Sequence, residues 1–188
     1  EGNIKDNIIY GNEPISADID PIHLEKLKFP IFLEVTYQDG KYHITGKYKN
    51  ISDDDESAKP MKYTIDRTAS RLPFSINTSV GIISLKRTEA KALPEGKVLK
   101  ICIMSPTMAA VKYTKSLSVS QTSKTTTIAQ LVLNDEMPKR ATDYLKQLAE
   151  CYNRQANEDK NEIALRTEQF INTRLEKINS ELGQTEGN

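Results

Sequence analysis

A long C-terminal stretch without a helix breaker constrains the fold more than any other feature. From Lys139 to Leu182 the sequence contains neither proline nor glycine, and apolar residues recur at the alternating spacing of four and three that marks one helix face. Two such stripes are present: Ala141, Leu145, Leu148 and Tyr152, and then Ile171, Leu175, Ile178 and Leu182. The pattern predicts one continuous helix over 138–182, about 65 Å long.

The residues beside this stretch indicate where the helix begins and ends. Asn134 and Asp135 are suitable capping residues, and Pro138 suits a first helical turn. Gly183 suits the position just after a helix. A helix of this length exceeds the width of a small β region. We therefore expect part of it to protrude, or to pack on something absent from this chain.

Between the two stripes, residues 153–162 are polar on nearly every face. This stretch and its continuation supply the candidate oligomer or partner surface, for which we select five residues: Arg154, Asn157, Lys160, Glu162 and Arg166. A solvated helix face is the alternative explanation of the same polarity. Glu150 with Arg154, and Glu162 with Arg166, have the i, i+4 orientation that favours ion pairs.

The preceding part of the chain has the alternating pattern of β-strands. Residues 31–37 and 42–48 place apolar side chains at every second position, and Asp39-Gly40 between them is a pair typical of a type I′ turn. A two-residue turn there predicts three opposing pairs on one apolar face: Tyr37 with Tyr42, Val35 with Ile44, and Leu33 with Gly46.

Further strands are predicted along the rest of this region. Their ranges are 61–66, 74–78, 81–87, 98–104, 117–121 and 127–133, with a turn at 93–96 and a short helix that begins at Pro106. The fold class is therefore α+β, an antiparallel β-rich region followed by one long protruding α-helix. We expect a β-rich module over 1–92, an incomplete α/β base over 93–136 and the truncated helix over 137–188.

Composition excludes some partners. Among 188 residues, 26 basic residues balance 26 acidic ones, so no overall field attracts nucleic acid.

No run of about 18 apolar residues exists, and no signal peptide is visible. We expect both ends to be boundaries within a longer protein. Cys102 and Cys151 are predicted to be unpaired, buried thiols.

No pattern of catalytic, cofactor-binding or metal-binding residues is present. Glycines occur singly, so there is no phosphate-binding loop, and no serine lies in a nucleophile elbow. His23 and His43 lack the matched ligand spacing of a metal site, and we expect His43 to face solvent. The acidic run 53–56 lacks the spacing of a calcium loop, and we expect a solvated loop there. We predict no enzyme activity and no cofactor for this chain.

The order of motifs in the second half resembles a known family. Ile103-Met104-Ser105-Pro106 leads into a helix with alanines, Leu117-Ser118-Val119 and the segment 123–131 follow, and Pro138-Lys139-Arg140-Ala141 opens the long helix. Over residues 98–186 this order is similar to the periplasmic domain of chain-length determinants, the polysaccharide co-polymerases. It most resembles members fused to a cytoplasmic tyrosine autokinase. The earlier β-rich part looks like an additional module.

The resemblance implies the periplasmic portion of a bacterial inner-membrane protein with two transmembrane helices and a kinase domain beyond the second. It implies a homo-oligomer that works with polysaccharide polymerase and export machinery, and polysaccharide itself is a further candidate partner. The first strand of the family's base sheet and the returning half of the long helix would lie outside this chain. The expected function is control of capsular or exopolysaccharide length and export. The alternative is a periplasmic adaptor of an efflux or secretion system.

Overall fold

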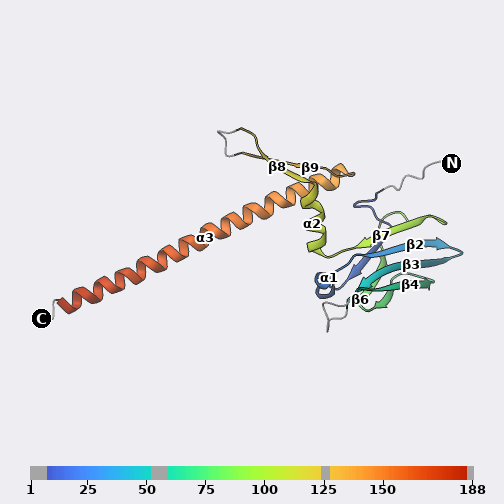
Figure 1. The fold of residues 1–188 in the computed structure, drawn as a ribbon, viewed down its shortest axis with the longest axis horizontal. Coiled ribbons are helices and arrows are strands. Elements are labelled where there is room, and N and C mark those ends of the chain that lie inside the picture. Colours follow the sequence, from blue (N-terminus) through green and yellow to red (C-terminus); the bar gives the residue numbers. More distant parts are fainter. Residues whose placement is uncertain (1–7, 52–58, 124–127, 186–188) are drawn as a thin grey trace. The chain divides into compact units, whose positions relative to one another are not determined.

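The computed structural model describes residues 8–51, 59–123 and 128–185, with side chains up to residue 180. The chain divides into two units, Glu1–Met137 and Pro138–Asn188, and Figure 1 shows their elements. The first unit contains β1 (Ile15–Ile19), α1 (Pro21–Lys26), β2 (Ile31–Gln38), β3 (Lys41–Asn50), β4 (Met61–Ala69), β5 (Phe74–Thr78), β6 (Gly81–Arg87), β7 (Val98–Ile103), α2 (Pro106–Ser116), β8 (Leu117–Gln121) and β9 (Ala129–Leu133). The second is the helix α3 (Pro138–Thr185). The α+β class is confirmed, with antiparallel sheets followed by one long helix.

Two sheets of the first unit share one hydrophobic core. The described strands form a three-stranded sheet in the order β1-β6-β5, a four-stranded sheet in the order β4-β3-β2-β7, and the two-stranded ribbon β8-β9. Buried side chains from both larger sheets belong to a single cluster, among them Ile15, Ile76, Ile83 and Leu85 from one sheet and Leu33, Val35, Ile44 and Leu99 from the other. The arrangement is a β-sandwich, in which strand alternation sends every second residue inward.

The predicted hairpin is confirmed residue for residue. β2 and β3 pair with Tyr37 opposite Tyr42, Val35 opposite Ile44 and Leu33 opposite Gly46. Asp39 has φ 52° and Gly40 has φ 72°, as a type I′ turn requires at both central positions. The local pattern was sufficient here because the turn sets the register of both strands.

Pairing between distant strands was not predicted. β7 hydrogen-bonds to β2 along its whole length, from Ile31 opposite Ile103 to Thr36 opposite Val98. The predicted boundary between residues 92 and 93 therefore separates two strands that lie in the same sheet. β1 and α1 were not predicted either.

The two longer helices follow their sequence signals, with changes at the ends of α3. Pro106 opens α2, and the Ser105 hydroxyl caps it by accepting a hydrogen bond from the Met108 amide at 3.2 Å. α3 is continuous over 48 residues, about 72 Å. It extends past Gly183, which was predicted to lie just after its end. Asp135 lies just before α3, and its carboxylate accepts a hydrogen bond from the Met137 amide at 2.7 Å.

The cysteine prediction was half right. Cys102 and Cys151 are unpaired, but Cys102 is exposed and Cys151 is half-buried. The inward positions of β7 are Leu99 and Ile103, so alternation turns Cys102 to the outer face of the sheet. The acidic run 53–56, for which we predicted a solvated loop, lies outside the described residues.

Candidate interaction surface

The five selected residues all lie on α3, and all are exposed. They do not form one face. At about 100° per residue, Arg154, Asn157 and Lys160 succeed one another around one side of the helix, whereas Glu162 and Arg166 lie on the other. Together the five cover about 240° of the circumference, so a single flat partner cannot contact all of them.

Only one predicted ion pair of this stretch forms among the described residues. Arg166 Nη2 contacts Glu162 Oε1 one turn away, with both side chains more than half exposed. A pair so open to solvent contributes little to stability. Arg154 instead donates to the Cys151 sulfur at 3.5 Å. The polar stretch is therefore a solvated surface with local contacts along the helix.

The apolar residues beyond it are a stronger candidate. Ile171, Leu175 and Ile178, here called the distal stripe, are 50%, 52% and 43% exposed. Leu182, the last predicted member, has no described side chain. Because α3 is continuous, helix geometry places the distal stripe about 120° around the axis from the first stripe. The two stripes therefore face different surroundings.

Three further exposed apolar residues of α3 were missed in the sequence, and two of them share one face of the helix: the three are Ile163, Leu165 and Phe170. Ile163 is 65% exposed and Phe170 is 70% exposed. Ile163 lies 18 residues after Leu145, about five complete turns, so it continues the direction of the first stripe, and Phe170 follows it by seven residues. Ile163 and Phe170 form an i, i+7 apolar pair in the sequence, but the many polar residues around Ile163 make this pair hard to recognise. Alternating exposed apolar faces along one helix suit contacts with more than one neighbour.

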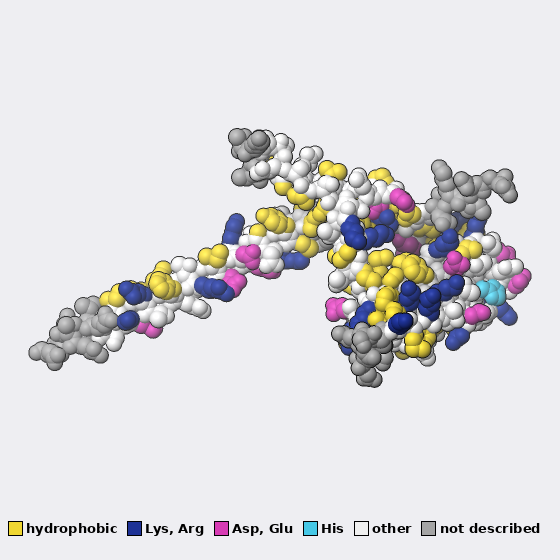
Figure 2. Space-filling view, in the orientation of Figure 1, with side chains coloured by type: hydrophobic (Ala, Val, Ile, Leu, Met, Phe, Trp, Pro, Cys, Tyr) yellow, Lys and Arg dark blue, Asp and Glu magenta, His cyan; other side chains and the backbone are white. Residues whose placement is uncertain are grey.

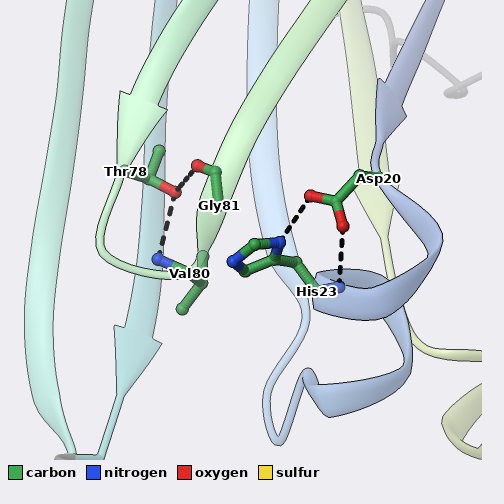
Figure 3. Close-up of polar contacts among 5 residues, drawn as sticks. All are labelled: Asp20, His23, Thr78, Val80 and Gly81. Atoms are coloured by element: carbon green, nitrogen blue, oxygen red, sulfur yellow. Dashed lines mark hydrogen bonds and ion pairs between the residues drawn. The ribbon is translucent and has the colours of Figure 1, made fainter.

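The histidines have structural roles in the described residues. Asp20 is the N-cap of α1, and its carboxylate accepts from the His23 amide at 3.1 Å and contacts His23 Nδ1 at 2.5 Å (Figure 3). This amide hydrogen bond, followed by the contacts with the His23 ring, lowers the pKa of Asp20. His43 is exposed, as predicted, and contacts the Thr68 hydroxyl at 3.4 Å. The described side chains contain no group of three His, Cys, Asp or Glu that could hold a metal.

The turn between β5 and β6 packs against α1. The Thr78 hydroxyl donates to the Gly81 carbonyl at 2.6 Å and accepts from the Val80 amide at 3.2 Å, as Figure 3 shows beside His23. Gly81 has φ 121°, and a Cβ there would lie 3.0 Å from Cβ and Cγ of His23. His23 therefore serves to close the end of the sandwich against this turn.

Comparisons with known proteins yield no relative. No protein-family model matches the chain, no curated protein matches it, and no solved structure matches it. In the part of the chain that the structure describes, no helix combines the length and the apolarity needed to cross a membrane.

Proposed function

We propose that this chain is a non-catalytic, extracytoplasmic module of a membrane polysaccharide co-polymerase of the autokinase type. In this proposal α3 joins neighbouring copies, and the assembled ring controls the length and export of capsular or exopolysaccharide. The parent protein would carry the kinase activity on the other side of the membrane. The order of motifs over residues 98–186 supports this assignment.

The observation that carries the proposal is the distal stripe on a 48-residue helix. Ile171, Leu175 and Ile178 each expose about half of their surface. Covering that half would contribute about 1 kcal/mol for each side chain. Three side chains from each of two copies would contribute about 6 kcal/mol in total, which is at the low end of the roughly 4–15 kcal/mol that it costs to bring two free proteins together. The stripe is thus suited to copies that are already held close together, as anchoring in one membrane would do.

The deciding experiment replaces the stripe in the full-length protein. The triple variant Ile171→Ser, Leu175→Ser, Ile178→Ser should reduce cross-linked oligomers and alter the polysaccharide length distribution in cells. Folding should persist, because all three side chains are exposed on a helix. Leu165→Ser is the matched control, since Leu165 is 58% exposed on another face of α3, and it should change neither readout.

Two outcomes would contradict the proposal. The first is a triple variant with normal polysaccharide length and yield. The second is a full-length sequence without flanking transmembrane segments and a Walker-type kinase domain. A returning helix between two lipoyl-like halves would favour the adaptor of an efflux or secretion system instead.

A further inference from the structure

A groove lies on the outer face of the four-stranded sheet, on the side away from the shared core. Its cavity of about 490 Å³ is lined by residues that include Phe29, Pro30, Phe32, Lys47, Lys49 and Lys62. Strand register brings these side chains together. Phe32 on β2 is opposite Lys47 on β3, and Lys49 on β3 is opposite Lys62 on β4. The groove thus joins three ammonium groups to an apolar wall.

The described lining of the groove carries charge of one sign. Among the residues that the structure describes, none that lines it is acidic. Lys49 and Lys62 are cross-strand partners, so their Cα atoms are about 5 Å apart, and like charges in such a pair destabilise a sheet. Lys47 follows on the same face, about 7 Å from Lys49 along β3. A bound anion would remove this repulsion.

The acidic residues of this sheet face lie outside the groove. Glu34 and Asp66 flank Thr45 in the next row of the same face. Glu34 is opposite Lys100 on β7. On the face of the first unit that Figure 2 shows, hydrophobic and basic side chains lie next to one another. In the part of this sheet face that the structure describes, the three lysines therefore gather at one end, in a chain whose total charge is zero.

Phe32 is the most exposed aromatic residue of the described lining. Lys49 Nζ lies 5.9 Å from the ring centre of Phe29, a cation–π contact that occupies this ring. Phe32 is 55% exposed. Its ring can therefore pack against the apolar face of a ligand while the lysines bind that ligand's charges.

Contacts beneath the sheet hold the floor of the groove in place. Tyr48 and Tyr63 are stacked with ring centres 5.0 Å apart and planes 12° apart. The Tyr48 hydroxyl accepts from the Ser79 amide at 3.2 Å, and the Asn50 amide group donates to the Ser79 carbonyl at 3.3 Å. These bonds tie β3 to the turn of the other sheet, so the lysines project from a rigid base.

We propose that this groove binds a segment of acidic polysaccharide through the carboxylates of its uronic acid units, an inference that rests on the proposed function for the choice of partner. A pyranose ring has an apolar C–H face that suits Phe32, and its carboxylates suit the three ammonium groups. Lipid surfaces are recognised by larger clusters of four to eight basic residues. Single-stranded nucleic acid is recognised by successive aromatic platforms. In this lining, Tyr48 and Tyr63 are stacked on each other and Phe29 lies under Lys49, which leaves Phe32 as the most exposed ring.

The test uses the 188-residue chain and a galacturonate hexamer as the probe, with binding measured by calorimetry. The wild-type chain should bind the hexamer, and added salt should weaken binding. Lys47→Gln with Lys62→Gln should weaken it by about tenfold or more, and Phe32→Ser should also weaken it. Lys41→Gln is the matched control, because Lys41 is exposed on the same strand at its other end, and it should leave affinity unchanged.

Several results would overturn the inference. These are absence of binding by the wild-type chain, equal affinity for neutral maltohexaose, unchanged affinity in the groove variants, or binding only to phosphatidylglycerol vesicles or single-stranded RNA. Such failure is distinguishable from failure of the proposed function, which depends on the distal stripe and polysaccharide length in cells. If the groove binds the hexamer but the triple variant of the distal stripe shows normal oligomers and normal polysaccharide length, the binding site stands and the assembly role is rejected.

Discussion

Gly46 lies opposite Leu33 in the β2–β3 hairpin, and the Leu33 side chain occupies the space that a Cβ at position 46 would need. That Cβ would lie 2.6 Å from Leu33 Cδ2 and 2.7 Å from the backbone oxygen of Phe32. The Leu33 side chain could adopt another rotamer, but the Phe32 oxygen is part of the backbone of the paired strand β2 and cannot move independently. Gly46 thus permits the close approach of two core strands.

Gly46→Ala should therefore destabilise the chain, by about 1–3 kcal/mol, as overpacking of a core does. Urea unfolding measures this as a lower midpoint with an unchanged slope. Gly40→Asn is the control, because Gly40 has φ 72° and a Cβ at this position would meet nothing within 4 Å, and asparagine tolerates this conformation. Equal stability of Gly46→Ala and the wild type would refute the close packing of this pair.

Asp20 should stabilise the fold only in its ionised form. Its pKa is lowered from 3.8, chiefly by the hydrogen bond from the His23 amide. The folded state therefore favours the carboxylate, and the resulting stability is present above pH 3.8 and is lost as the pH falls through the lowered pKa. Asp20→Asn should be less stable than the wild type at neutral pH, and the difference should vanish in strong acid.

NMR titration of Asp20 measures the shift directly. His23→Ala keeps the backbone amide, which is the largest cause, so most of the lowering should remain. An Asp20 carboxyl that titrates at or above 3.8 in the wild-type chain would show that the cap is not formed in solution.

Cys102 should react slowly for an exposed thiol. Partial covering of its sulfur raises its pKa, and the charge of Lys112 on α2 opposes that rise. Less thiolate is then present at a given pH, so alkylation in a Cys151→Ser background should be slower than in the unfolded chain. The pKa of Cys102 is raised in the folded chain, so the contribution of this thiol to stability is fully present below the pKa of the unfolded chain. This contribution is lost as the pH rises from that value through the folded pKa.

Lys112→Gln should slow the alkylation of Cys102 further, because it removes the charge that favours the thiolate. Lys115→Gln on the same helix is the control and should leave the rate unchanged. A faster reaction in Lys112→Gln would show that the lysine acts by shielding the sulfur rather than by its charge.

The local elements of the fold were accessible from the sequence. The Asp39-Gly40 turn determined the register from Tyr37–Tyr42 to Leu33–Gly46 because a two-residue loop permits one alignment of apolar faces. The length of α3 followed from a stretch without breakers. Its candidate surface stays a prediction, and the choice of polar residues gave no weight to Ile163 and Phe170, which are exposed.

The association of distant segments was decided by tertiary structure alone. The pairing of β7 with β2, the pairing of β1 with β6 and the core shared by the two larger sheets all join residues far apart in the chain. A local period shows which face of a strand is apolar, but not which other strand will cover it. That choice depends on how whole surfaces fit together, and it places β7 beside β2 and the two larger sheets against one core.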